Sequence, residues 1–277
     1  MRTTRPTSKT GQRTGARGSA VLNVMTETAG KAGRSLVRDF GDVENLQVSK
    51  KGPADFVTAA DKQAEKIIFE NLSRARPNYS FLMEERGAVT GADISNRWIV
   101  DPLDGTLNFL HGLPHFAVSI ALERDGELFA GVIYEPVSDQ MFWAEKGQGA
   151  FLNGRRIRVS ARQDPAESVF ATGIPFMGRD GHQPFLSQLE SVMAVSAGVR
   201  RFGAAALDLA YVAAGRYEGF WETGLNAWDM AAGIVLVREA GGMVSDFSNR
   251  QRMLERGEVI ATNGTLHETL RKLVRVS

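Results

Sequence analysis

The chain contains no cysteine among its 277 residues. That absence excludes disulfide bonds, thiol nucleophiles and zinc–thiolate sites, and it fits a reducing compartment such as the cytoplasm. Long apolar runs are also missing, since no stretch approaches the roughly eighteen residues of a membrane span. Net charge is small, because 33 basic and 32 acidic residues leave a formal charge of +1. We therefore expect a cytoplasmic protein without a membrane partner, and the overall charge gives no argument for nucleic acid.

Basic residues are concentrated at the N-terminus. Residues 1–18 contain five of them and no acid: Arg2, Arg5, Lys9, Arg13 and Arg17. The segment is rich in Thr, Ser and Gly and almost without apolar residues, which predicts a disordered extension. An arm that binds nucleic acid or a targeting segment is the alternative. A secretory signal is excluded, because no apolar stretch follows the charges.

The residues that follow predict a folded domain that contains both helices and strands. With 43% hydrophobic residues, the chain is long enough to bury a large core. Apolar side chains recur at helical spacing over 20–40, and strand-like segments then dominate the first half of the chain. In the second half, strands alternate with helices. We expect one domain over 19–277 with two subdomains, about 19–165 and 166–277.

The most informative stretch is 98–110, Trp-Ile-Val-Asp-Pro-Leu-Asp-Gly-Thr-Leu-Asn-Phe-Leu. Its first three residues predict a buried strand that stops at a tight corner, because proline and glycine follow at once. Asp101 and Asp104 lie three residues apart on this corner and would repel each other if unpaired. The next basic residue in the chain is Arg124. A hard cation from solution is therefore the expected partner.

Four other acids each have two interpretations on local grounds. Asp61 completes a capping-box pattern at the start of a predicted helix, and Asp229 stands where a helix N-cap is expected. Glu84 is the first of two acids after a predicted short strand, which is typical of a solvated surface. Glu222 ends another predicted strand. Each of them is either such a local structural feature or part of a site.

Two motifs together carry a resemblance to a known family. Asp101-Pro102-Leu103-Asp104-Gly105-Thr106 resembles the signature of the inositol monophosphatase family of metal-dependent sugar phosphatases. About 125 residues further on, Trp228-Asp-x-Ala-Ala-Gly and the later Glu239-Ala-Gly-Gly resemble the second signature of that family. The resemblance covers roughly residues 20–275. It implies an α+β fold, a layered αβαβα sandwich of the inositol monophosphatase and fructose-1,6-bisphosphatase type, and a homodimer.

The resemblance also implies a magnesium site with two or three ions. Mg²⁺ is a hard cation that takes oxygen ligands, and its ligands here would be Glu84, Asp101, the Leu103 carbonyl, Asp104 and Asp229. Asp61 and Thr106 would orient the attacking water, with Glu84 as a further catalytic group. The expected substrate contacts are Asp104, Gly105, Thr106, Gly203, Ala204, Ala205, Glu222 and Asp229.

The implied activity is Mg²⁺-dependent hydrolysis of inositol monophosphate, or of a related polyol or sugar phosphate, by in-line attack of a metal-activated water. Lithium sensitivity is a further implication of the family. Alternatives within the same class are fructose-1,6-bisphosphatase, histidinol phosphatase and nucleotide 3′-phosphatase. An alternative of a different class is an interaction protein of the RNA or transcription machinery, which the basic N-terminus suggests.

Overall fold

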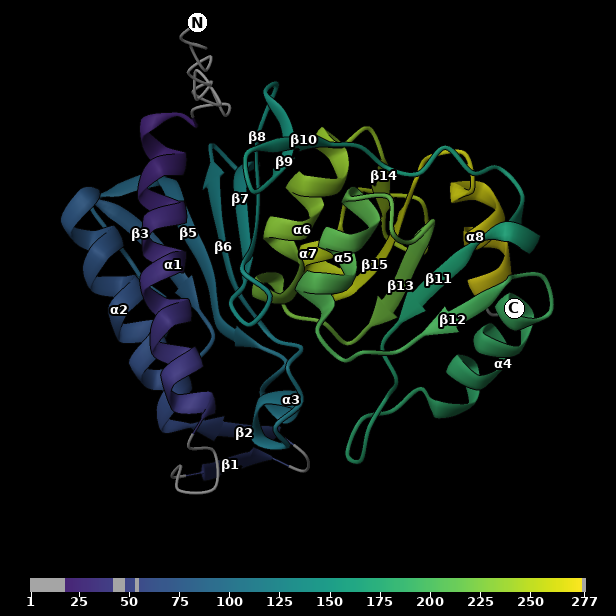
Figure 1. The fold of residues 1–277 in the computed structure, drawn as a ribbon, viewed down its shortest axis with the longest axis horizontal. Coiled ribbons are helices and arrows are strands. Elements are labelled where there is room, and N and C mark those ends of the chain that lie inside the picture. Colours follow the sequence, from purple (N-terminus) through teal and green to yellow (C-terminus); the bar gives the residue numbers. More distant parts are fainter. Residues whose placement is uncertain (1–17, 42–47, 53–54, 276–277) are drawn as a thin grey trace, which may run out of the picture.

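The computed structural model describes residues 18–41, 48–52 and 55–275. The predicted basic extension, residues 1–18, therefore lies outside the described residues except for its last one. The described chain forms five stacked layers, in the order helix, sheet, helix, sheet, helix (Figure 1). This arrangement confirms the expected layered α+β sandwich. None of the described helices is both long and apolar enough to cross a membrane.

The first sheet has eight strands in the order β10-β9-β8-β7-β6-β5-β3-β4. Neighbours run antiparallel except β3 and β5, which run parallel. In chain order, the strands are β3 (Tyr79–Met83), β4 (Gly87–Val89), β5 (Asp93–Asp104), β6 (Ala117–Arg124), β7 (Glu127–Glu135), β8 (Gln140–Glu145), β9 (Gly149–Leu152) and β10 (Arg155–Ile157). Strand β5 is paired on both sides, so the chain leaves the end of β5 from inside the sheet and not from its edge.

Two long helices cover the outer face of this sheet (Figure 1): α1 (Ala20–Phe40) and α2 (Ala59–Ala75). Helix α1 has the predicted bounds, and its N-cap Ser19 accepts a hydrogen bond from the Leu22 amide (3.3 Å). Helix α2 begins with the predicted capping box of Thr58 and Asp61. A separate ribbon, which pairs β1 (Val48–Gly52) with β2 (Asp55–Thr58), leads into α2.

The second sheet has five strands in the order β12-β11-β13-β15-β14. Strand β11 runs parallel to both neighbours, whereas β15 runs antiparallel to β13 and β14. The strands are β11 (Val169–Thr172), β12 (Gly198–Arg200), β13 (Gly219–Thr223), β14 (Met243–Ser245) and β15 (Glu258–Thr262). Helices α4 (His182–Met193) and α8 (His267–Val274) form the outer layer on this side (Figure 1).

The middle layer consists of α5 (Ala205–Ala213) and α6 (Ala227–Glu239), between the two sheets (Figure 1). Glycines allow α6 to pack closely on both sides. A Cβ at Gly131 of β7 would lie 2.5 Å from the Ala232 carbonyl oxygen, and one at Gly233 would lie 2.4 Å from the Leu209 Cβ. Helix α6 is therefore held between β7 and α5. Two short helices complete the fold, α3 (Thr106–Leu110) and α7 (Met253–Arg256), with a 3₁₀ turn at Pro165–Glu167.

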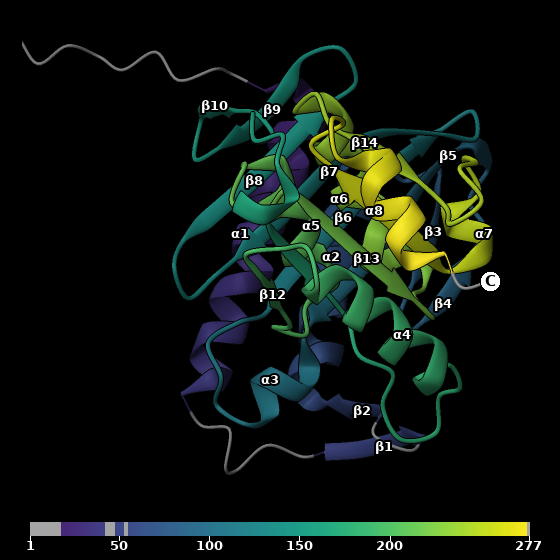
Figure 2. The ribbon, with the colours of Figure 1, turned by 90° about the vertical axis from the view of Figure 1, so that its right-hand side faces the viewer.

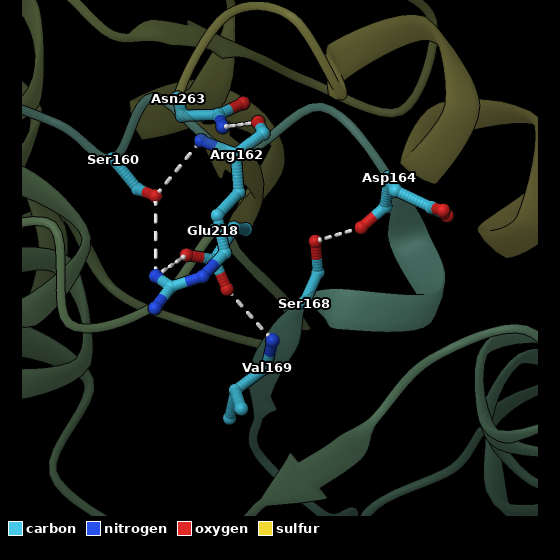
Figure 3. Close-up of polar contacts among 7 residues, drawn as sticks. All are labelled: Ser160, Arg162, Asp164, Ser168, Val169, Glu218 and Asn263. Carbon is cyan, nitrogen blue, oxygen red and sulfur yellow. Dashed lines mark hydrogen bonds and ion pairs between the residues drawn. The ribbon is translucent and has the colours of Figure 1, made fainter.

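Residues 158–168 connect the two sheets, and a buried acid anchors this crossing (Figure 3). Glu218 is only 1% exposed and accepts hydrogen bonds from Arg162 Nη1 (2.9 Å) and the Val169 amide (2.7 Å). Asn263 Nδ2 donates to the Arg162 carbonyl (2.7 Å). One side chain thus ties the crossing segment to the first residue of β11.

Replacing Glu218 with Ala is expected to lower the free energy of unfolding by about 1–3 kcal/mol, the cost of leaving a buried donor without its acceptor. In a chain of this size that corresponds to a fall in Tm of several degrees, measurable by calorimetry. The matched control is Glu167→Ala, which removes an exposed acid of the same crossing segment. Equal losses in both variants would contradict the anchoring role.

Candidate active site

The end of β5 differs from the expected strand stop. The strand does not end before the first aspartate but runs through to Asp104. Its register against β6 shifts between Asp101 and Asp104, so Pro102 and Leu103 form an irregularity that a proline can occupy. Asp101 is 2% exposed, and its Oδ1 accepts a hydrogen bond from the Leu103 amide (2.9 Å). The two aspartates are therefore fixed at the buried end of a strand.

Gly105 turns the chain from β5 into the short helix α3. It has φ 91°, and a Cβ there would lie 3.0 Å from the His115 carbonyl oxygen, so only glycine fits. The same Cβ would lie 3.4 Å from the Ala204 Cβ. Asp104 Oδ2 accepts a hydrogen bond from the Ala206 amide (2.8 Å). These contacts bring the end of β5 against the predicted substrate turn, Gly203, Ala204 and Ala205.

Asp61 and Thr106 meet although 45 residues separate them. Thr106 Oγ1 lies 3.2 Å from Asp61 Oδ1 and 3.0 Å from the Leu103 carbonyl oxygen, within reach to donate to either. Asp61 Oδ2 accepts from the amide (2.9 Å) and the hydroxyl of Thr58. Burial raises the pKa of Asp61 to about 6, although the Thr58 hydrogen bonds lower it. Asp61 therefore fills both predicted roles, helix cap and partner of the motif threonine.

Glu84 follows β3 directly, beside the end of β5. Its amide donates to the Val100 carbonyl (3.2 Å), one residue before Asp101. Two residues on, the Arg86 amide donates to Glu65 Oε2 (3.2 Å), and the guanidinium lies 4.2 Å from the centroid of the Phe69 ring. Arg86 thus packs on α2, whereas Glu84 is held at the end of β3, beside Val100 of β5.

Asp229 comes from the first turn of α6. The N-cap interpretation needs a correction, because Asn226 occupies the N-cap and Asp229 is the third helical residue. Asp229 Oδ2 accepts a hydrogen bond from the Asn226 amide (2.7 Å), which completes a capping box. The Trp228 carbonyl accepts from Ser119 Oγ of β6 (3.3 Å). This contact joins the start of α6 to the strand beside β5.

Glu222 lies on β13, and its carboxylate occupies space that only a glycine leaves open: a Cβ at Gly173 would lie 1.9 Å from it. Burial raises the pKa of Glu222 to about 8, with Asp229 adding to the rise and Arg201 and Arg179 opposing it. The residue borders a cavity of about 320 Å³, lined by Ile174, Pro175, Phe176, Arg179, Asp180, Glu222, Thr223 and Gly224. The cavity is of a size typical of small-molecule sites.

The acids of the two halves influence one another. Burial raises the pKa of Asp101 well above its usual range, and three acids raise it further: Glu84, Asp104 and Asp229. The pKa of Asp104 is likewise raised by burial first, then by Asp229, Glu222 and Glu84. The predicted metal-ligating side chains thus form one electrostatic cluster, built from β3, β5 and α6.

Asp208 is a buried acid near the site that was not among the predicted site residues. It is 1% exposed, and its Oδ1 has no hydrogen-bond partner among the described residues. Burial raises its pKa, and Glu222 and Asp104 raise it further. A sequence signal exists, because Asp208 is the one charged residue in the small-residue helix of α5.

The donor chemistry of this cluster fits a hard divalent cation. All its side-chain donors are carboxylate oxygens, and the raised pKa values show that added positive charge would relieve their repulsion. Across the described ranges, no three His, Asp or Glu side chains lie close enough to form a ready-made metal cage. Hydrogen bonds to backbone amides hold several of the carboxylates in place instead.

The layered sandwich gathers these acids where its two halves meet. The family model described as "Inositol monophosphatase family" matches residues 18–277. The chain belongs to the inositol monophosphatase family.

Relatives of known name agree with this assignment. An inositol-1-monophosphatase of Mesorhizobium japonicum is 61% identical over 257 residues, which cover 93% of this chain and 97% of the relative. A protein of Pseudomonas aeruginosa named Nus factor SuhB is 45% identical over 247 residues, 88% and 91% of the two chains. The crystal structure of extragenic suppressor protein suhB from Bartonella henselae superposes with a TM-score of 0.91 at 57% identity, covering 93% and 99% of the chains.

Proposed function

We propose that this protein is a Mg²⁺-dependent phosphomonoesterase that acts on inositol monophosphate or a related polyol or sugar phosphate. The observation that carries the proposal is the buried cluster around Asp101 and Asp104, whose acids raise one another's pKa. Ionising several acids that are buried together is costly, and bound cations would offset that cost.

Five oxygen donors would hold two or three Mg²⁺ ions: Glu84, Asp101, the Leu103 carbonyl, Asp104 and Asp229. A divalent ion supplies a water of lowered pKa and stabilises the charge that develops on the phosphoryl oxygens. Backbone hydrogen bonds restrict the motion of the carboxylates, so the chain itself fixes where positive charge is favourable.

The chain's own residues would position water and phosphate. When Asp61 is ionised, its Oδ1 accepts a hydrogen bond from the Thr106 hydroxyl (3.2 Å), which leaves a lone pair of Thr106 Oγ1 to accept a hydrogen bond from water. The amides of Gly105 and Thr106 open α3 and would donate to phosphate oxygens. Glu84 would assist from the end of β3.

The polyol part of the substrate would occupy the cavity beside Glu222, against the turn of Gly203, Ala204 and Ala205. An ionised carboxylate only accepts hydrogen bonds, and the hydroxyls of a polyol ring donate them. This favours a phosphate ester with several neighbouring hydroxyls; the alternatives on the same scaffold are fructose bisphosphate, histidinol phosphate and a nucleotide 3′-phosphate. Phosphate release across a panel of these esters, with and without Mg²⁺, tests the proposal; release that does not depend on Mg²⁺ would refute it.

Glu222→Gln is expected to lower kcat/KM for inositol monophosphate by roughly ten- to a hundredfold. The substitution keeps the shape but loses a charge whose hydrogen bonds are worth about 1.5–3 kcal/mol, and 1.4 kcal/mol is about tenfold. The assay belongs at pH 8.5, above the pKa of about 8, so that the wild-type carboxylate is ionised. An aryl phosphate has no ring hydroxyls, so its kcat/KM should fall only slightly in Glu222→Gln. Equal losses on both substrates would instead assign Glu222 to the fold or to the metal site.

The family supports three further proposals. We propose a homodimer, located in the cytoplasm and inhibited by lithium. The two sheets also suggest the subdomains 19–165 and 166–277, because the first sheet ends at Ile157 and the second begins at Val169.

A second candidate function is interaction with the RNA or transcription machinery. Its support is the relative named Nus factor SuhB, together with the five basic residues that precede Gly18. The two functions do not exclude each other, since the acids proposed to hold the metal are all present.

Removing residues 1–17 is expected to leave the phosphatase rate and Tm unchanged, because the segment has too little apolar surface to dock. The truncation keeps Ser19, the N-cap of α1. If the segment binds RNA, the same truncation should abolish a salt-sensitive RNA affinity in a gel-shift assay. A large fall in rate or Tm would show that the segment is structural.

A further inference from the structure

A second, larger cavity of about 600 Å³ lies on the outer side of the second sheet. Its walls come from α4, α8 and the segment between β14 and β15, elements that lie together on the face shown in Figure 2. None of the acids proposed to hold metal lines it. Four arginines do, from three separate parts of the chain: Arg250, Arg256, Arg271 and Arg275.

These arginines leave a surplus of positive charge. Arg271 forms a bidentate pair with Glu268 through Nε (2.8 Å) and Nη2 (2.7 Å), so its Nη1 is the nitrogen outside that pair. Glu258 also lines the cavity and opposes the arginines; its Oε1 accepts from the Phe247 amide (3.3 Å). Asp246, whose Oδ1 accepts from the Arg250 amide, is a third acid beside the cavity, so the four arginines against Glu258, Glu268 and Asp246 leave a formal charge of +1.

Among the described residues, no acceptor binds the other three guanidinium groups. Within the described part of the chain, the side chains of Arg250, Arg256 and Arg275 have no hydrogen bond or ion pair. Their backbones are nevertheless fixed. The Arg250 amide donates to Asp246 Oδ1 (2.7 Å), and Arg256 ends α7 at Gly257, which has φ 65°. Guanidinium groups carried by a fixed backbone are suited to bidentate hydrogen bonding with phosphate.

The cavity also has an apolar side. Phe185, Phe247, Pro184 and Val274 line it together with the arginines. Its volume is within the range of small-molecule sites and leaves room for more than an inorganic anion. A ligand with phosphate groups and a flat ring would match a cavity lined by arginines and aromatic side chains. Phosphates pair with guanidinium groups, and aromatic and guanidinium faces stack on ring systems.

We propose that this cavity is a binding site for a nucleoside diphosphate, separate from the proposed active site. The arginines would bind the two phosphates, and the phenylalanine side would contact the base. Thr223 lines both this cavity and the one beside Glu222, so the two sites share a wall at the end of β13.

The test is isothermal titration calorimetry of the full chain with ADP in EDTA. Without divalent ions, the acidic cluster of the proposed active site repels phosphate, whereas the arginine cavity needs no metal. We expect one ADP per chain, and an affinity about a hundredfold weaker in the double variant Arg250→Ala/Arg256→Ala, each arginine accounting for about tenfold. Arg250→Ala alone should show the tenfold step.

The matched control is Arg155→Ala/Arg156→Ala, which removes the same charge from exposed positions on β10. It should bind ADP as the wild type does. Adenosine should bind far more weakly than ADP, and the double variant should keep the Tm and phosphatase rate of the wild type. Absence of saturable ADP binding, binding that requires Mg²⁺, equal affinity in the double variant, or adenosine binding as tightly as ADP would each overturn the proposal.

Discussion

Asp104→Asn is expected to lower kcat by at least about a hundredfold and to raise the Mg²⁺ concentration needed for half-maximal rate. Stabilisation of transition-state charge by a bound ion is worth several kcal/mol, and each 1.36 kcal/mol is tenfold in rate. The asparagine oxygen can still accept the hydrogen bond that the Ala206 amide donates to Asp104 Oδ2 (2.8 Å). The substitution therefore removes one negative charge from the cluster and leaves its anchoring bond.

Asp104→Asn should not be less stable than the wild type in the absence of metal, although its activity is lower. The pKa of Asp104 is raised in the folded chain, so the stability that this group contributes is fully present below its unfolded pKa of about 3.9 and is lost as pH rises through the folded pKa. An asparagine has no such loss. At pH 8 in EDTA, the variant should melt at or above the Tm of the wild type, while added Mg²⁺ should raise its Tm less.

The control is Asp125→Asn, which changes an exposed aspartate at φ 51°, a conformation that asparagine also tolerates. It should retain the kcat and the Mg²⁺ dependence of the wild type. If Asp104→Asn also kept both, Asp104 would be a structural residue that anchors α5, and the metal proposal would lose one of its ligands.

Local patterns in the sequence predicted much of the fold. The helix of α1 and the capping box of α2 depend on spacing within one or two turns, so they could be read without knowledge of tertiary contacts. The end of β5 could not. The sequence favoured a stop before Asp101, because proline cannot donate to a ladder, yet the bulge at Pro102 lets the strand continue to Asp104.

Contacts between distant residues set the limits of prediction in the site. That Asp61 and Thr106 pair was implied by family resemblance alone, since no local rule joins residues 45 positions apart. Asp208 was missed for a related reason: it is the one charged residue of α5, but only the packing of α5 between the sheets places it near Asp104 and Glu222. The arginine cavity combines residues from α7, α8 and a turn, and no spacing in the sequence reveals it.

Asp61→Asn is expected to reduce kcat at pH 8 by about a hundred- to ten-thousandfold, the range for losing a positioned group in proton transfer. Thr106 Oγ1 carries one proton, and it lies within reach of both Asp61 Oδ1 (3.2 Å) and the Leu103 carbonyl (3.0 Å). An ionised Asp61 attracts that proton, whereas an asparagine amide group turned toward Thr106 would donate instead. The Thr106 hydroxyl would then accept a hydrogen bond from that amide group and would no longer be oriented to accept one from the attacking water.

The pH dependence of the wild type provides the sharper test. Burial raises the pKa of Asp61 to about 6, so between about pH 4 and pH 6 the stability that this group contributes falls as pH rises, while the ionised fraction that supports catalysis grows. At saturating Mg²⁺, kcat should decline as the pH falls and Asp61 becomes protonated, and Asp61→Asn should lack that decline. Thr106→Ser keeps the hydroxyl and should keep most of the rate, and Thr106→Ala should not. An acid decline of kcat that persists unchanged in Asp61→Asn, or a Thr106→Ala variant as fast as Thr106→Ser, would remove this pair from the mechanism.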